Sequence, residues 1–121
     1  MKSYKDLIAW QKSIELVQEI YKCTTDFHFT ESFGITKQMR RASVSIPSNI
    51  SEGHARNTTG EFKQFLGIAK GSLAELETLI IISDRLKYIE PKISENLHSR
   101  CQEISKLLHG LLKALSHRKK Q

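Results

Sequence analysis

The chain has 121 residues, of which 39% are hydrophobic and 26% are charged, so it is long enough for one compact domain and too short for most larger enzyme architectures. Its formal charge of +6 at pH 7 favours an acidic partner such as nucleic acid. It has no run of about 18 apolar residues, which a membrane span needs, and its N-terminus lacks the apolar segment of a signal peptide. We therefore expect one domain over residues 1–121 that has no contact with a membrane.

The two cysteines, Cys23 and Cys101, are too few for a disulfide framework and lie far apart, each among apolar residues at helical spacing. This pattern is typical of reduced, buried thiols in a reducing compartment. We therefore expect a cytoplasmic protein.

The first of four segments with helical spacing opens at Ser3 or Tyr4 and ends at Thr24 and Thr25, which are poor helix formers. Its apolar residues alternate steps of three and four, as in bundle helices. The predicted core stripe is Leu7, Trp10, Ile14, Val17, Tyr21 and Thr24, with Ile8 and Ile20 beside it.

The second segment continues this spacing through Ile35, Met39, Ala42, Ile46, Asn49 and Gly53. Pro47 lies inside it, where a proline removes one backbone hydrogen bond and presses on the carbonyl of Ser43. We expect a continuous helix with a kink; the alternative is a helix that stops near Ser45 and restarts with Pro47 as its first residue.

The third segment begins with a capping box, in which Thr58 is followed three residues later by Glu61, and the fourth begins near Pro91. The stripe of the third is Phe62, Phe65, Ala69, Leu73, Leu76, Ile80 and Ser83; that of the fourth is Ile93, Leu97, Cys101, Ile104, Leu108, Leu111 and Leu115. Four such helices with short connections predict an all-α, antiparallel up-down-up-down four-helix bundle, with a basic, fraying tail over residues 117–121.

Two glycines, Gly67 and Gly71, lie four residues apart inside the third segment. Each costs close to 1 kcal/mol relative to alanine in a helix, so we expect a compensating close approach of another backbone, within the chain or between subunits. The alternative is that both are tolerated surface glycines.

A polar group lies on or next to the apolar stripes of the second and third segments: Arg40, Arg41, Asn49, Glu52 and Glu75. A buried carboxylate needs a cation or a hydrogen-bond donor. We expect a polar network that fixes helix register or a subunit interface, with solvated charges as the alternative.

Residues 91–121 contain seven basic and two acidic residues and carry most of the excess charge. Four of the cations near the end are candidates for phosphate contacts: Lys113, Arg118, Lys119 and Lys120. A solubilising tail at the negative end of a helix dipole accounts for them equally well.

No arrangement of residues indicates an enzyme. A di-metal site in a bundle needs two Glu-x-x-His pairs, and only Glu95 with His98 has that spacing. The string Lys70-Gly71-Ser72 has the wrong order for a phosphate loop. We therefore expect no catalytic residue, no metal and no cofactor.

Three strings resemble a known family: QMRRASVSIPSNISEG at residues 38–53, YKDLIAW at 4–10, and FKQFLGIAKGSLAELE at 62–77. Together with the leucine-rich last segment they are similar to the four-helix-bundle proteins encoded in intervening sequences of bacterial 23S ribosomal RNA genes. The first string is the specific one.

This resemblance implies a left-handed bundle that often forms a homopentamer and has no established catalytic residues. The family is similar in fold to accessory proteins of retroelements, which associate with a reverse transcriptase and nucleic acid. Two functions therefore remain open. One is a nucleic-acid-associated accessory protein that contacts RNA or DNA, and the other is a protein-interaction scaffold that binds a partner such as a reverse transcriptase.

Overall fold

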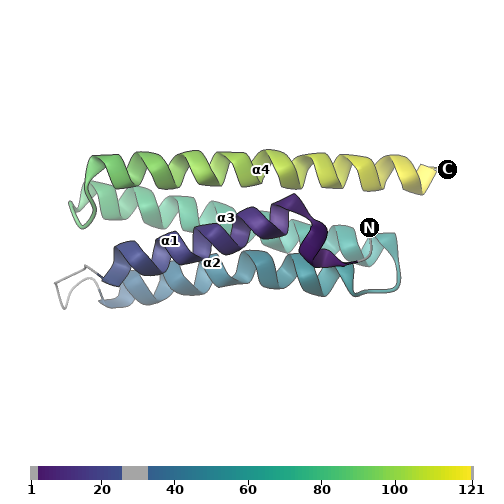
Figure 1. Cartoon of the computed structure of the whole chain (residues 1–121), viewed down its shortest axis with the longest axis horizontal. Helices are drawn as coiled ribbons and strands as arrows, with labels where there is room; N and C mark the ends of the chain where they lie inside the picture. Colours follow the sequence, from purple (N-terminus) through teal and green to yellow (C-terminus); the bar gives the residue numbers. More distant parts are fainter. Residues whose placement is uncertain (1–2, 26–32, 121) are drawn as a thin grey trace.

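The computed structural model describes residues 3–25 and 33–120, and for Phe33 and residues 118–120 it describes the backbone alone. A short 3-10 turn, η1 (Tyr4–Asp6), precedes four helices: α1 (Ile8–Thr25), α2 (Phe33–His54), α3 (Thr59–Arg85) and α4 (Pro91–Lys120). The chain reverses direction at each connection (Figure 1). The expected all-α four-helix bundle is confirmed.

The helices form a closed ring in which each packs against two neighbours. α1 contacts α2, α2 contacts α3, α3 contacts α4, and α4 returns to α1; within the described residues the diagonal pairs do not meet. The contact between α2 and α3 is the most extensive. The largest fully buried side chains fill the centre of this ring: Leu16, Ile20, Met39, Ile46, Ile50, Leu66, Leu76, Ile80, Leu97, Cys101, Ile104 and Leu108.

The beginning of the chain differs from the expected single helix. The Ser3 hydroxyl accepts a hydrogen bond from the Lys5 amide at 3.1 Å and caps η1, and the backbone is extended at Leu7 before α1 begins. The rings of Tyr4 and Trp10 meet edge to face with centroids 5.4 Å apart. This contact fixes η1 against the first turns of α1.

The core stripe expected for α1 is correct at its two ends, because Leu7 and Thr24 are buried. Between them the buried face lies about one residue away from the expected one. The buried side chains are those of Ala9, Ser13, Leu16, Ile20, Cys23 and Thr24. Trp10 is only half-buried, while Tyr21 is 42% exposed and Ile8 is 56% exposed. The small residues Ala9 and Ser13 let α1 lie close to its neighbours, and the Ser13 hydroxyl donates to the Ala9 carbonyl at 2.6 Å, which satisfies the buried polar group.

Helix α2 passes through Pro47 without a break, so the interpretation of a continuous helix is correct. Pro47 is buried and cannot donate to the Ser43 carbonyl four residues earlier. The Ser43 hydroxyl donates to the Arg40 carbonyl at 2.8 Å, so a second polar group of this buried turn is satisfied locally. The continuous helix keeps Ile46 and Ile50 in the core.

Helix α3 begins as the capping box predicts, because the Thr58 hydroxyl accepts a hydrogen bond from the Glu61 amide at 3.1 Å. It ends in a Schellman turn in which a lysine occupies the position where glycine is usual. Lys87 has φ of 63°, and the Tyr88 amide donates to the Ser83 carbonyl at 2.8 Å.

The stripes expected for α3 and α4 lie toward the core with small corrections. Phe62 and Phe65 are half-buried on α3. On α4, Ile93 is 36% exposed and Leu111 half-buried, while Ser94 is buried. The helical backbone of α4 extends through residues that the sequence assigned to a fraying tail.

Cys23 and Cys101 are both buried and free of disulfides, as expected.

Candidate nucleic-acid interface

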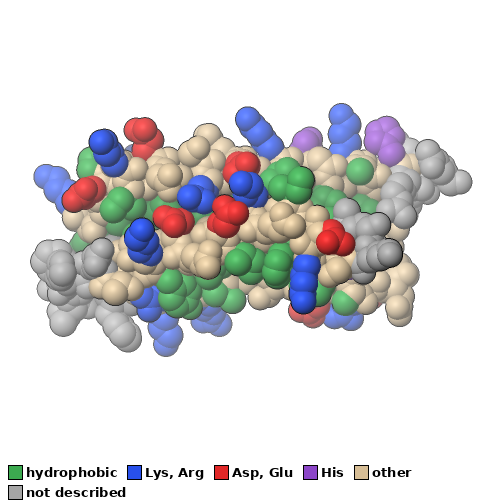
Figure 2. All heavy atoms as spheres, viewed as in Figure 1, with side chains coloured by type: hydrophobic (Ala, Val, Ile, Leu, Met, Phe, Trp, Pro, Cys, Tyr) green, Lys and Arg blue, Asp and Glu red, His purple; other side chains and the backbone are tan. Residues whose placement is uncertain are grey.

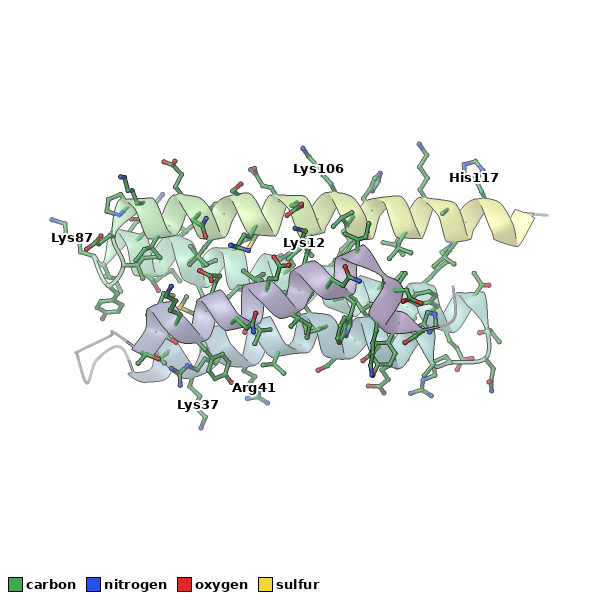
Figure 3. All side chains as sticks on the ribbon, in the orientation of Figure 1. Lys12, Lys37, Arg41, Lys87, Lys106 and His117 are labelled. Atoms are coloured by element: carbon green, nitrogen blue, oxygen red, sulfur yellow. The ribbon has the colours of Figure 1, made fainter. Side chains whose placement is uncertain are left out.

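The outer face of α4 carries a row of basic side chains toward its C-terminal end. The spacing of three and four residues places them on one side of the helix, and all four are exposed: Lys106, His109, Lys113 and His117. We call these four residues the basic stripe. Figure 3 shows Lys106 and His117 pointing away from the bundle on the same side, and Figure 2 shows lysine, arginine and histidine side chains along this edge.

Glu103 lies three residues before Lys106, at the start of the basic stripe, and α4 has no acidic residue after it. One turn earlier the situation differs. Lys12 lies 3.9 Å from Glu15 and 4.0 Å from Glu103, and Arg100 lies 3.5 Å from Glu15. Cations in the middle of the α1–α4 face are therefore paired, whereas the C-terminal half of α4 presents positive charge to solvent.

Only part of the predicted phosphate-binding set can be placed. Lys113 is exposed and belongs to the basic stripe. The side chains of Arg118, Lys119 and Lys120 lie outside the described residues, although their backbone continues α4. The sequence interpretation missed Lys106 and His109, which the three-and-four spacing back from Lys113 would have indicated.

The expected polar network does not form as one unit within the chain. Arg40 contacts α1: its Nε donates to the Thr24 hydroxyl at 2.9 Å, and its guanidinium lies 4.5 Å from the centroid of the Tyr21 ring. Asn49 takes part in a separate contact, because its Nδ2 donates to Ser45 Oγ at 2.9 Å and Ser45 Oγ lies 2.8 Å from Ser72 Oγ on α3. These two contacts bind α2 to different neighbours.

The remaining charges of that group face solvent. Glu52 pairs with Arg56 one turn later on α2 at 3.1 Å. Arg41 and Glu75 are exposed and make no hydrogen bond or ion pair within the described part of the chain. Within one chain, Glu52, Arg41 and Glu75 are therefore solvated charges and not members of a buried polar network.

The close approach expected at Gly67 and Gly71 is absent inside the described chain. Both glycines are exposed, and a Cβ atom added at either would meet nothing within 4 Å. Gly53 is the tight position instead, because a Cβ there would lie 2.6 Å from the Cβ of Phe65. Two explanations of Gly67 and Gly71 therefore stay open: a contact between subunits, or surface positions at which glycine is tolerated.

The same side of α3 is unusually apolar for a surface. Ile68 is 48% exposed, Ile81 42% and Ile82 38%. Helical spacing places them on the same side of α3 as Gly67, Gly71 and Ala74, which are also exposed, with Ile68 beside the glycines and Ile81 and Ile82 nearer the C-terminal end of the helix. We call these six residues the outer α3 face.

Two features of the described residues bear on catalysis. Burial, with a smaller contribution from the charge of Glu77, raises the pKa of the Cys101 thiol to about 12, so the thiolate nucleophile is not formed near neutral pH. No three His, Cys, Asp or Glu side chains within residues 3–25 and 33–117 gather to hold a metal ion. Across the same residues, none of the helices has the length and apolarity to cross a bilayer.

These features define an all-α bundle with one exposed basic stripe and one exposed apolar face. The family model described as 23S rRNA-intervening sequence protein matches residues 5–110, and the chain belongs to this family. A crystal structure from Bacteroides thetaiotaomicron is similar to it with a TM-score of 0.82 and 27% identity, covering 88% of this chain and 99% of the other. That protein is described as one of unknown function from the S23 ribosomal protein family. No curated protein matches the chain.

Proposed function

We propose that the protein is a non-enzymatic, oligomeric accessory protein that associates with nucleic acid through the basic stripe of α4. The observation that carries this proposal is the exposed row of Lys106, His109, Lys113 and His117 without an acidic residue after Glu103. Lys106 and Lys113, the two lysines of this row, can neutralise phosphates and release condensed counterions, which gives sequence-independent binding. The reduced, buried cysteines are in keeping with a cytoplasmic setting.

Assembly would make weak phosphate contacts effective. One subunit offers four side chains in the stripe, whereas a symmetric oligomer repeats them, so contacts that face one surface add through avidity. A pentamer, which the family resemblance implies, would present five copies. The outer α3 face is the surface we assign to assembly, because three exposed isoleucines lie on the same side of the helix as two glycines at which an added Cβ would meet nothing within 4 Å.

Replacing Lys106 and Lys113 with glutamine is expected to weaken binding to RNA and DNA at low salt. For duplex DNA, the loss of two phosphate contacts makes the slope of log K against log salt shallower by about 1.8. Fluorescence anisotropy with labelled oligonucleotides, over a roughly fourfold range of salt from about 50 to about 200 mM, measures both effects. Truncation after Ser116 should weaken binding further.

The matched control removes two cations elsewhere, with Lys87→Gln and Lys92→Gln at the exposed α3–α4 turn. It should bind nearly as the parent protein does. Absence of any binding by the parent protein at low salt would refute the proposed function.

Replacing Gly71 with leucine should dissociate the oligomer while leaving the helices intact. The added side chain meets open space within the chain but would project from the assembly surface. Sedimentation velocity should show a parent protein several times heavier than the 13.9 kDa chain and a lighter variant. Gly110→Leu, at another exposed glycine with open space, is the control. A monomeric parent protein would contradict the assembly.

A second candidate function is a protein-interaction scaffold, and one observation favours it. A mostly apolar groove of about 280 Å³ lies between α1 and α2, lined by Tyr4, Trp10, Ile14, Val17, Val44, Pro47, Ser48 and Ser51. Figure 2 shows hydrophobic side chains gathered over these helices. A partner helix with an apolar face would fit such a groove. If the scaffold alone is correct, nucleic-acid binding is absent and a groove substitution such as Trp10→Ser abolishes partner binding.

A further inference from the structure

A second basic surface lies where α1 ends and α2 begins, apart from the basic stripe. An open hollow of about 440 Å³ is lined by Tyr21, Thr36, Lys37, Arg40 and Arg41. Three of these five side chains are cationic and one is aromatic. Figure 3 shows Lys37 and Arg41 on the opposite edge of the molecule from Lys106 and His117.

The aromatic side chain of the hollow is held in place by its neighbours. The guanidinium of Arg40 lies 4.5 Å from the centroid of the Tyr21 ring, within the range of a cation–π contact. Arg40 is itself fixed, because its Nε donates to the Thr24 hydroxyl at 2.9 Å. Tyr21 nevertheless remains 42% exposed. The ring is therefore ordered by one contact and still offers surface to a ligand.

The two outer cations of the hollow have no acidic partner among the described residues. Lys37 and Arg41 lie four residues apart on α2, are both exposed, and have no ion pair or hydrogen bond in the described part of the chain. Residues 33–51 contain three basic residues and no aspartate or glutamate. Their positive charge is thus uncompensated along the first five turns of α2.

We propose that this hollow binds single-stranded nucleic acid, with one base against Tyr21 and adjacent phosphates on Lys37 and Arg41. An aromatic ring beside a basic track is the arrangement that holds unpaired bases, because every base has a π-face and the backbone follows the cations. A duplex keeps its bases stacked on one another, so it has no unpaired base that can stack on the Tyr21 ring. The inference rests on the proposed function and adds to it a preference for unpaired strands and a second contact surface.

The test compares a 12-nucleotide oligouridylate with an RNA duplex by fluorescence anisotropy, on the full-length protein. The probe length is roughly the site size of a small single-strand binding surface. Lys37→Gln with Arg41→Gln should weaken oligouridylate binding by about tenfold or more at low salt and flatten the salt slope by about 1.4. Tyr21→Leu should weaken it at least about fivefold, the lower range for one stacked base.

Three controls separate this site from general charge effects. Tyr21→Phe keeps the ring and should retain single-strand affinity. Lys87→Gln with Lys92→Gln removes equal charge from another exposed region and should retain it as well. Circular dichroism and thermal unfolding check that each variant keeps its helices. Unchanged oligouridylate affinity in Lys37→Gln/Arg41→Gln, or equal loss in the charge control, would overturn the inference.

The outcomes also distinguish this inference from the proposed function. If the Lys106→Gln/Lys113→Gln variant loses binding and the Lys37→Gln/Arg41→Gln variant does not, the α4 interface stands and the hollow is not a site. If the parent protein binds neither RNA nor DNA, both fail. If Lys37→Gln/Arg41→Gln loses binding to anionic vesicles and keeps its oligouridylate affinity, the hollow is a lipid surface and the inference fails.

Discussion

Replacing Gly53 with alanine is expected to destabilise the protein by about 2 kcal/mol, since overpacking a close contact outweighs the better helix propensity of alanine. The new Cβ would lie 2.6 Å from the Cβ of Phe65 and 3.3 Å from the Phe62 carbonyl oxygen. Both atoms are on or next to the α3 backbone, so rotation of a side chain cannot relieve the contact. Urea unfolding followed by circular dichroism measures the loss.

Gly110→Ala is the matched control, since it makes the same change inside a helix. Gly110 is exposed, and an added Cβ meets nothing within 4 Å. This variant should gain about 0.5–1 kcal/mol of stability from helix propensity. If the free energy of unfolding falls in Gly53→Ala and rises in Gly110→Ala, the tight α2–α3 contact at Gly53 is confirmed. A rise in both variants would contradict it.

Replacing Ile20 with alanine should cost about 3 kcal/mol, the middle of the range for removing a buried isoleucine side chain. Ile20 is fully buried in the centre of the bundle. Ile14→Ala, the same change on the same helix, should cost about 1 kcal/mol, because Ile14 is only half-buried and its removal leaves no enclosed cavity. Urea unfolding of both variants measures the difference.

This pair of variants decides which face of α1 lies in the core. The sequence places Ile14 at the centre of the stripe and Ile20 at its edge, whereas the structure places them the other way. A larger loss for Ile14→Ala would contradict the orientation of α1 in the structure.

The helices were predictable because their signals are local. Capping at Thr58, the proline that opens α4 and the regular stripes of α3 and α4 depend on residues within one or two turns. The face of α1 that lies in the core was not predictable, because two sets of its residues share the same spacing of three and four. The buried set that includes Ala9 and Ser13 is less hydrophobic than the set that includes Trp10 and Ile14, and only packing against α2 and α4 selects it. The residue at which α3 ends was not predictable either, since Lys87 occupies a position where glycine is usual.

The candidate interfaces were less predictable than the fold. Net charge directed attention to Lys113, but the full basic stripe requires knowing which side of α4 faces solvent. The hollow at Tyr21 combines residues from two helices, and the sequence assigned Tyr21 to the core and Arg40 to a polar network. Glycine spacing drew attention to Gly67 and Gly71, whereas the tight contact occurs at Gly53, which has no glycine partner one turn away. Such contacts between helices leave no mark in one sequence.

The ring of helix contacts also sets an order of events during synthesis. Three of its four interfaces join consecutive helices through short connections, so each can form once its second helix has been made. The fourth joins α1 to α4, the first helix to the last. Until α4 emerges, Lys12 and Glu15 lack Glu103 and Arg100, and the flank of α1 beside them is open to water. In a three-helix intermediate without α4, this flank of α1 would therefore stay exposed until the last helix packs against it.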